Sequence, residues 1–412
     1  MNRVAITGLG VISPVGQDIE TVYANLRDGV CGVGRITRFD PSETKISVAA
    51  EVKDFDPEAF GISRGDTRRM DLFTQYAMAA AQQAVDDSGI VGAVAPERLG
   101  VYVGSGIGGM NTFVAECKKL FDRGPSRISP LFIPMMIGNI AAGNIAIRYG
   151  CKGPSLPVVT ACATSTNTIG EAFHAIRYGY ADAILAGGSE ATVNPLAIGG
   201  FANCKALTEA TDPEAASLPF DRRRAGFVLG EGAAIVVLEN YDHAIARGAH
   251  IYAEMCGYGN TCDAHHITAP DPEAGGGARA IRLAYEEAGS PEGLLYINAH
   301  GTGTPLNDSS ETLAIKKALG EEKARAAMVS STKSMTGHML GATGAAEAIA
   351  SLMAIYNDIV PPTVNLVEPD EECDLDYTPL TARKMEVTAA LSTSLGFGGH
   401  NGCLAFKKIG KE

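Results

Sequence analysis

Residues 158–170 read VVTACATSTNTIG: a short β-branched run, a lone cysteine, and then small polar residues. The following GEAFHAIRYGYADA has helical spacing, so the segment predicts a buried strand that passes into a helix, with Cys162 at the junction. A cysteine in such a place is most often a small buried hydrophobe. The alternative is a nucleophile, because the small neighbours leave the sulfur open to a substrate. The rest of the chain decides between the two.

Apolar runs and helical patterns alternate along the whole chain, and this alternation indicates an α/β fold. We expect helices at 68–89, 277–289 and 308–320, and strands at 99–110, 181–191, 232–240 and 294–304. A weak repeat is visible: VYVGSGIGG and the cysteine unit in the first half, then YINAHGTGT and MVSSTKSMTGHMLGATGAAEAIASLMAIY in the second. The repeat suggests two duplicated halves that join near residues 241–250.

Composition limits the class of protein. The chain has 412 residues, of which 46% are hydrophobic and 20% charged, enough for two domains or one large two-part core. Nine cysteines, an odd number without a C-x-x-C pair, favour reduced thiols in the cytoplasm. We expect no signal peptide and no membrane span. The net charge of −13 argues against nucleic acid, but leaves room for an acidic protein partner at local basic clusters in 63–69, 123–127 and Lys205.

Two motifs suggest cofactors that we do not expect. Gly104, Gly106 and Gly109 match G-x-G-x-x-G after a predicted strand, yet no acidic strand end follows at the spacing of a dinucleotide site. Cys262 and the adjacent histidines in TCDAHHITAP (residues 261–270) lack a fourth ligand at zinc-site spacing. We therefore expect neither a nicotinamide cofactor nor a metal.

Three reactive residues lie at predicted strand ends or in loops of small residues. Cys162 lies where the free N–H groups of a helix would favour a thiolate and can also face an oxyanion. His300 in NAHGTGTPLND and His338 in TKSMTGHMLGATGAAE belong to the second half. Strand ends in α/β sheets face one crevice, so we expect the three side chains to share a pocket. The glycines around Phe397 in LGFGGHN allow a tight turn whose backbone N–H can supply a second oxyanion donor.

At this point the motifs VTACATS, AHGTGTPLND, TKSMTGHMLGATGAAE and GFGGHN, with FDRRRAGFVLGEGA at 220–233, resemble the β-ketoacyl-[acyl-carrier-protein] synthases of fatty-acid synthesis, type II. The resemblance runs over nearly the whole chain. It implies a thiolase-like fold, with two duplicated halves in a five-layered αβαβα core, and a homodimer without cofactor. We expect the halves at 1–248, with the cysteine, and 249–412, with both histidines.

The resemblance also implies the chemistry. Cys162 would take an acyl chain from acyl-carrier protein, with the backbone N–H groups of Cys162 and Phe397 holding the oxyanion. His300 and His338 would stabilise the enolate formed when malonyl-carrier protein loses carbon dioxide, giving a 3-oxoacyl-carrier protein longer by two carbons. Two imidazole donors suit that charge. The other expected residues are Lys333 and Glu347 beside the histidines, Ile107, Phe201, Thr302, Thr304 and Gly398 for substrate, and Arg68, Arg69, Arg127 and Lys205 for docking of the acidic carrier protein.

Two positions depart from the family pattern, and several alternatives stay open. Ala225 replaces a usual acidic residue, which puts a salt bridge there in doubt, and His400 replaces a common threonine.

A thiolase would share the fold, and Cys403 superficially suggests its second thiol, but the lysine-bearing histidine motif argues against it. A polyketide-type ketosynthase is closer. A non-catalytic subunit of the chain-length-factor kind lacks the nucleophile, which Cys162 supplies, and a cysteine protease is less likely still.

Overall fold

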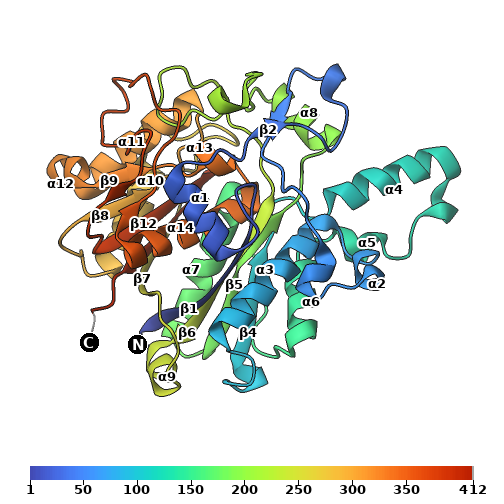
Figure 1. Cartoon of the computed structure of the whole chain (residues 1–412), viewed down its shortest axis with the longest axis horizontal. Coiled ribbons are helices and arrows are strands. Elements are labelled where there is room, and N and C mark those ends of the chain that lie inside the picture. The colour runs from blue at the N-terminus through green and yellow to red at the C-terminus, as the bar shows by residue number, and fades with distance from the viewer. Residues whose placement is uncertain (411–412) are drawn as a thin grey trace.

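The computed structural model describes residues 1–410, and its centre is a mixed sheet of nine strands (Figure 1). Across the sheet these are β4 (Leu99–Gly104), β5 (Ala183–Glu190), β6 (Gly232–Asn240), β1 (Val4–Ile12), β7 (Ala253–Cys262), β13 (His400–Lys407), β12 (Ala389–Gly396), β8 (Leu295–Asn298) and β9 (Met328–Ser330). Two short ribbons pair β2 (Gly34–Arg35) with β3 (Val48–Ala49), and β10 (Ile359–Val360) with β11 (Arg383–Lys384).

The sheet has the same topology in both halves of the chain. In the first half β1 is antiparallel to β6, β6 is antiparallel to β5, and β5 is parallel to β4. In the second half β7, β13, β12 and β8 repeat these relations in the same order. The two halves meet where the first residues of β1 pair with the first residues of β7. The repeat seen in the sequence therefore corresponds to a duplicated fold.

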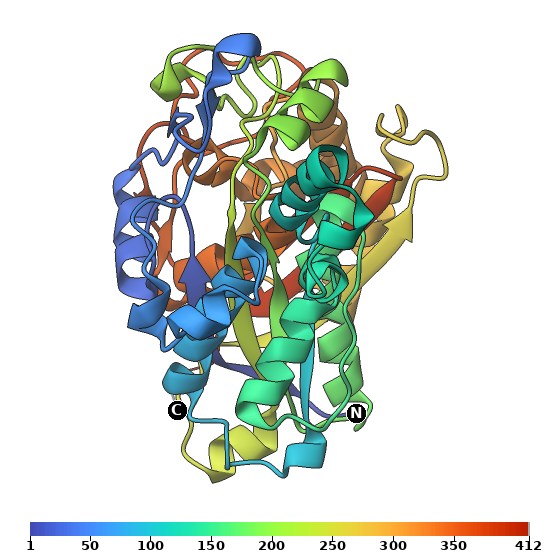
Figure 2. The same ribbon diagram turned by 90° about the vertical axis from the view of Figure 1, so that its right-hand side faces the viewer.

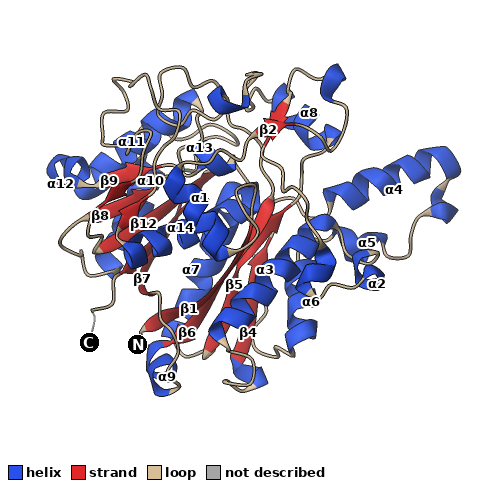
Figure 3. Ribbon diagram, in the orientation of Figure 1, coloured by secondary structure: helices blue, strands red, loops and turns tan. Residues whose placement is uncertain are grey.

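Helices fill the space between the two halves of the sheet and cover both outer faces (Figure 3). The central layer is α7 (Thr164–Arg177) with α14 (Thr343–Asn357), and both are buried over most of their length. The outer layers are α3 (Leu72–Ser88) with α6 (Ile140–Tyr149), and α10 (Gly275–Glu287) with α11 (Pro305–Leu319). The result is the five-layered αβαβα arrangement that the resemblance implies.

The two central helices pack closely because one of them carries a glycine at the contact. A Cβ atom added at Gly344 would lie 2.0 Å from the Thr166 hydroxyl. The Ser165 hydroxyl accepts from the Ala345 backbone N–H at 2.9 Å and so ties the helices together. Each helix also follows a 3₁₀ turn that starts with a left-handed residue: η5 (Ala161–Ala163) before α7, and η7 (Leu340–Ala342) before α14. The duplication thus extends to the turn that carries Cys162.

The remaining helices lie mostly around the edges of this core, and Figure 2 shows α4 to α6 along one side. They are α1 (Ile19–Asp28), α2 (Arg64–Thr67), α4 (Met110–Arg123), α5 (Phe132–Met136), α8 (Pro195–Asn203), α9 (Tyr241–Ala246), α12 (Glu321–Ala326), α13 (Lys333–Thr336), and the 3₁₀ turns η1 (Pro41–Glu43), η2 (Pro57–Phe60), η3 (Pro96–Arg98), η4 (Pro125–Arg127) and η6 (Pro213–Ala215). Among residues 1–410, no helix combines the length and apolar character needed to span a bilayer.

The expected elements exist, with shifted ends. The strand expected at 232–240 is β6, and the helix expected at 68–89 starts at Leu72, because the Asp71 side chain caps it. The strands expected at 99–110 and 294–304 end at Gly104 and Asn298, where the chain enters glycine-containing loops. The expectation of a strand before Cys162 is wrong. Residues 156–160 form a loop beside the edge strand β4, and Val159 is 58% exposed.

Candidate active site

The cysteine at the start of the central helix lies in a constrained turn. Ala161, just before it, has φ of 51°, a left-handed conformation that a residue with a side chain rarely adopts. Cys162 follows in η5 and is 9% exposed, and α7 begins two residues later. The turn therefore holds the sulfur at the entrance to a helix, buried but bordering a cavity.

Both histidines meet this sulfur, although they are 38 residues apart in sequence. The reactive atoms of Cys162, His300 and His338 all lie within 4.8 Å of one another. The two imidazoles make an edge-to-face contact, with ring centroids 5.3 Å apart and planes at 87°. The structure thus brings together the three residues that the sequence places at separate strand and helix ends.

His338 is oriented by groups on both sides of its ring. Its Nδ1 lies 3.0 Å from the hydroxyl of Thr343, the first residue of α14. When Nδ1 accepts from that hydroxyl, Nε2 carries the proton and is a hydrogen-bond donor. The Phe227 ring packs edge-on against the imidazole, with centroids 5.1 Å apart, and the His338 backbone N–H donates to the Val228 carbonyl at 2.7 Å.

His300 is held through its backbone. A buried carboxylate, Glu311 on α11, accepts from the N–H groups of His300 at 2.7 Å and Gly301 at 2.8 Å. The Thr393 hydroxyl on β12 donates to the same carboxylate at 2.6 Å. These bonds fix the loop after β8 and hence the position of the His300 ring.

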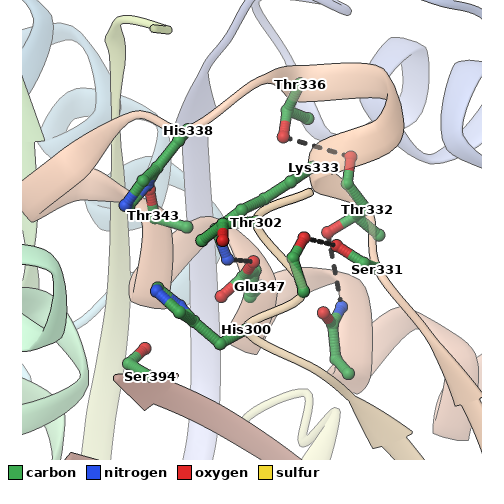
Figure 4. A network of polar contacts seen from close by, with 12 residues as sticks. His300, Thr302, Ser331, Thr332, Lys333, Thr336, His338, Thr343, Glu347 and Ser394 are labelled. Atoms are coloured by element: carbon green, nitrogen blue, oxygen red, sulfur yellow. Dashed lines mark hydrogen bonds and ion pairs between the residues drawn. The ribbon is translucent and has the colours of Figure 1, made fainter. Parts of the chain in front are cut away.

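A buried ion pair lies beside the histidines (Figure 4). Lys333, the first residue of α13, pairs with Glu347 on α14, and the two side chains are only 1% and 2% exposed. Burial raises the pKa of Glu347 to about 8, although Lys333 opposes this shift. Burial and the positive charge of Lys333 lower the pKa values of His300 and His338 well below the ordinary range. Both imidazoles are therefore neutral at pH 7.

The expectation of a preformed thiolate is wrong for the free protein. Burial raises the pKa of Cys162 to about 11. A hydrogen bond from the Phe397 backbone and the charge of Lys333 act in the opposite direction, but burial is the larger effect. The sulfur is therefore a thiol at neutral pH, with neutral imidazole nitrogens close enough to receive its proton.

The three side chains open into a cavity of about 440 Å³. Of the other expected site residues, Ile107, Phe201, Thr302, Thr304 and Phe397 line this cavity. The two threonine hydroxyls lie 3.0 Å apart. The Phe201 and Phe397 rings lie near each other at a tilt of 52°, with centroids separated by 6.5 Å.

Three expected residues lie outside the cavity lining. Lys333 and Glu347 are behind the histidines, and Gly398 is in the turn between β12 and β13, where its N–H donates to the Ile267 carbonyl at 2.8 Å. Gly398 thus shapes the turn that presents Phe397. His400 begins β13 opposite Cys262 and is half-buried. It does not line the cavity.

The expected docking residues are all exposed, but they are not all at the cavity. Lys205 lines its mouth, just after α8. Arg68 and Arg69 follow α2, and Arg127 ends η4. Only Lys205 is placed by the structure next to the reactive centre.

The salt bridge put in doubt by Ala225 is formed by its neighbour, Arg224. Ala225 is exposed, whereas Arg224 is buried and pairs with Asp370. The Arg224 Nε also lies 3.9 Å from a carboxylate oxygen of the fully buried Asp308. The segment therefore has a buried ion pair without an acidic residue at position 225.

Cys162, His300 and His338 form the only set of three metal-ligating side chains in mutual reach among residues 1–410. Their donor types suit zinc, but the nearby Lys333 cation opposes a second positive charge. The histidine pair near Cys262 forms no such set. The Nδ1 of His266 instead accepts from the N–H groups of Thr268 and Ala269, both at 3.1 Å.

Sequence reasoning missed several supporting residues, namely Glu190, Phe227, Glu311 and Thr343. Thr343 and Glu311 lie within the quoted motifs or just beyond them, so spacing along a helix could have suggested them. Phe227 lies within the quoted motif at 220–233. Glu190 carries no local signal and becomes recognisable only when distant segments are seen together.

Comparison with known proteins agrees with this geometry. Residues 1–244 match the family model of the β-ketoacyl synthase N-terminal domain, and residues 252–367 match that of the C-terminal domain. Over 409 residues the chain is 51% identical to the 3-oxoacyl-[acyl-carrier-protein] synthase 2 of Staphylococcus aureus (strain COL), covering 99% of this chain and 98% of the relative.

Two solved structures are also similar over almost the whole chain. The ishigamide ketosynthase/chain length factor has a TM-score of 0.92 and 37% identity, covering 99% of this chain and 100% of that one. A type II PKS acyl-carrier protein in complex with its ketosynthase (AntDE:AntF) has a TM-score of 0.91 and 34% identity, with the same coverage. Fold and site thus define a ketosynthase of the thiolase-like fold. The chain belongs to the β-ketoacyl synthase family.

Proposed function

We propose that this protein is a 3-oxoacyl-[acyl-carrier-protein] synthase, an acyltransferase of fatty-acid biosynthesis that lengthens an acyl chain by two carbons. The observation that carries the proposal is the meeting of Cys162, His300 and His338, with reactive atoms within 4.8 Å, in one cavity. The 51% identity to a relative of that name over nearly the full length supports it.

In the first half-reaction the Cys162 sulfur attacks the thioester carbonyl of an acyl-carrier protein. A carbon–sulfur bond forms to Cys162, and the carrier's thiol leaves. Because the Cys162 pKa is raised, a neutral imidazole takes the thiol proton as the bond forms, and the proton then passes to the departing carrier thiolate. The backbone N–H groups of Cys162 and Phe397 stabilise the oxyanion that forms meanwhile.

In the second half-reaction the carboxylate carbon–carbon bond of malonyl-carrier protein breaks and carbon dioxide leaves. The electron pair moves into an enolate, whose oxygen accepts hydrogen bonds from His300 and His338. The enolate carbon then attacks the acyl-Cys162 carbonyl, and Cys162 leaves as a thiolate that takes up a proton from water to restore the thiol. The Thr343 hydroxyl holds His338 in the tautomer that donates through Nε2.

The other residues have supporting parts. Lys333 keeps both imidazoles neutral, and the Glu347 side chain holds its ammonium group in place. The pantetheine arm would bind along Thr302 and Thr304. Further substrate contacts are Ile107 beside the acyl chain, Phe201, and the turn of Phe397 and Gly398 as a gate between the half-reactions.

The acidic carrier protein would dock on Arg68, Arg69, Arg127 and Lys205, which are exposed cations in a chain of net charge −13. We also place the protein in the cytoplasm, in keeping with nine free cysteines. We assign the halves to residues 1–248 and 249–412.

A homodimer is part of the proposal. Large apolar side chains are exposed together on the α4–α5 segment: Phe113, Leu120, Phe121, Leu131 and Ile133. A second copy of the chain would bury them.

A second candidate is a polyketide-type ketosynthase, because one structural neighbour is the ketosynthase of a type II PKS and another is described as a ketosynthase/chain length factor. Both are less identical to this chain, at 37% and 34%, than the fatty-acid relative. Turnover of plain acyl chains rather than polyketide chains distinguishes the two.

The test is mass spectrometry of peptides after incubation with acyl-carrier protein, followed by addition of malonyl-carrier protein. We expect one acyl group on Cys162 and then release of a 3-oxoacyl product. Cys162→Ala should abolish both. The matched control is Cys204→Ala, which removes an exposed thiol lining the same cavity and should retain both. Acylation at another residue, or extension by the Cys162→Ala variant, would contradict the proposal.

A further inference from the structure

The glycine loop that follows β4 binds an anion, but the anion belongs to the protein itself. The Glu190 side chain, at the end of β5, is fully buried and accepts four hydrogen bonds. The donors are the N–H groups of Gly106 (2.9 Å), Ile107 (3.2 Å) and Gly341 (3.1 Å) and the Ser105 hydroxyl (3.0 Å). Successive backbone N–H groups commonly form such cradles for anions. The motif that resembles a dinucleotide fingerprint therefore surrounds a carboxylate.

This carboxylate joins two walls of the cavity without lining it. Gly106 and Ile107 form one wall, and Leu340, next to Gly341, forms another. The fit is tight, because a Cβ atom at Gly106 would lie 2.7 Å from a Glu190 oxygen. Movement of Glu190 would therefore release both walls at once.

We infer that Glu190 is a positioning residue that sets acyl-chain selectivity by locking Ile107 against the η7 turn. The inference rests on the proposed function for its substrate class. Nothing in the acyl-transfer or decarboxylation steps uses Glu190 directly.

Glu190→Gln removes the negative charge and weakens the hydrogen bonding around this side chain at one predictable donor. Each carboxylate oxygen accepts two bonds, so the amide NH₂ must face two donors. The less costly orientation puts NH₂ toward Ser105 and Ile107, because the Ser105 hydroxyl can turn and accept. The Ile107 N–H then loses its partner, and the Gly106 and Gly341 bonds remain.

A second variant is Ser105→Ala, which weakens the same loop by removing another hydrogen-bond partner of Glu190. The Ser105 hydroxyl donates to Glu190 and accepts from the Gly108 N–H at 2.9 Å. Ser105→Ala also keeps the inference testable if Glu190→Gln fails to fold.

Two readouts on the full-length protein test the inference. Glu190→Gln should speed amide exchange at Ile107 by about 5- to 100-fold, the worth of one buried hydrogen bond. It should change the ratio of kcat/KM for a long over a short acyl chain by about tenfold. Ser105→Ala should change both exchange and selectivity as well.

A uniform loss of activity at all chain lengths, with exchange at Ile107 as in the wild type, would overturn the inference. Amide exchange requires no turnover. A wild-type protein without condensing activity would therefore refute the proposed function and leave the exchange readout to judge Glu190.

Discussion

Alkylation of the free protein measures how strongly burial suppresses the Cys162 thiolate. With a pKa of about 11, about 10⁻⁴ of the thiol is ionised at pH 7, against about 3% for an ordinary cysteine of pKa about 8.5. That difference alone is about 300-fold. A more basic thiolate is also more nucleophilic, by about 13-fold over this pKa range. The net expectation is alkylation by iodoacetamide about 25-fold slower than that of an ordinary cysteine.

The assay is peptide mass spectrometry over a pH series, and the chain carries its own references. Cys204 and Cys262 are exposed and should react at the ordinary rate in the same sample. The rate at Cys162 should rise about tenfold per pH unit from pH 7 to beyond pH 9, because only the ionised fraction reacts. Lys333→Met removes the charge that favours the thiolate and should slow the reaction further.

A rate at Cys162 that levels off below about pH 8 would refute this reasoning, since it would mean that the thiolate is already formed near neutrality. A Lys333→Met variant that reacts faster would refute the stated electrostatic cause. A slow rate caused only by blocked access would level off near the pKa of an ordinary cysteine, about 8.5, rather than rise beyond pH 9. The pH series separates these cases.

Two further predictions concern the scaffold and the docking surface. Arg224→Met leaves the buried Asp308 without its cation and should cost about 3–5 kcal/mol, or about 4–6 °C in melting temperature for a chain of 412 residues. Arg222→Met removes an exposed ion pair and should change the melting temperature little. Equal shifts of the melting temperature for the two variants would contradict the burial argument. Lys205→Glu should raise the KM for carrier protein at low salt and lose this effect at high salt; a KM that does not depend on salt would remove Lys205 from the docking surface.

Much of the fold could be predicted from local patterns. β6 and α3 follow from hydrophobic periodicity and from the turn residues at their ends, such as the left-handed Gly89 that stops α3. The expected strand before Cys162 failed for a nonlocal reason. Its β-branched residues run along the sheet edge beside β4 without joining the sheet, and periodicity cannot tell a strand from such a loop.

Residue types and spacing predicted that Cys162, His300 and His338 share a pocket, because thiols and imidazoles in loops of small residues are chemically recognisable, and the family resemblance supplied their roles. The protonation states of these three residues could not be predicted from the sequence. The helix-start position predicts a thiolate, whereas burial in the tertiary structure keeps the thiol protonated and both imidazoles neutral. Desolvation and the distance to Lys333 are properties of the packed molecule, and only the tertiary structure determines them. The same holds for the glycine loop, whose anion, Glu190, comes from a strand more than 80 residues away in sequence.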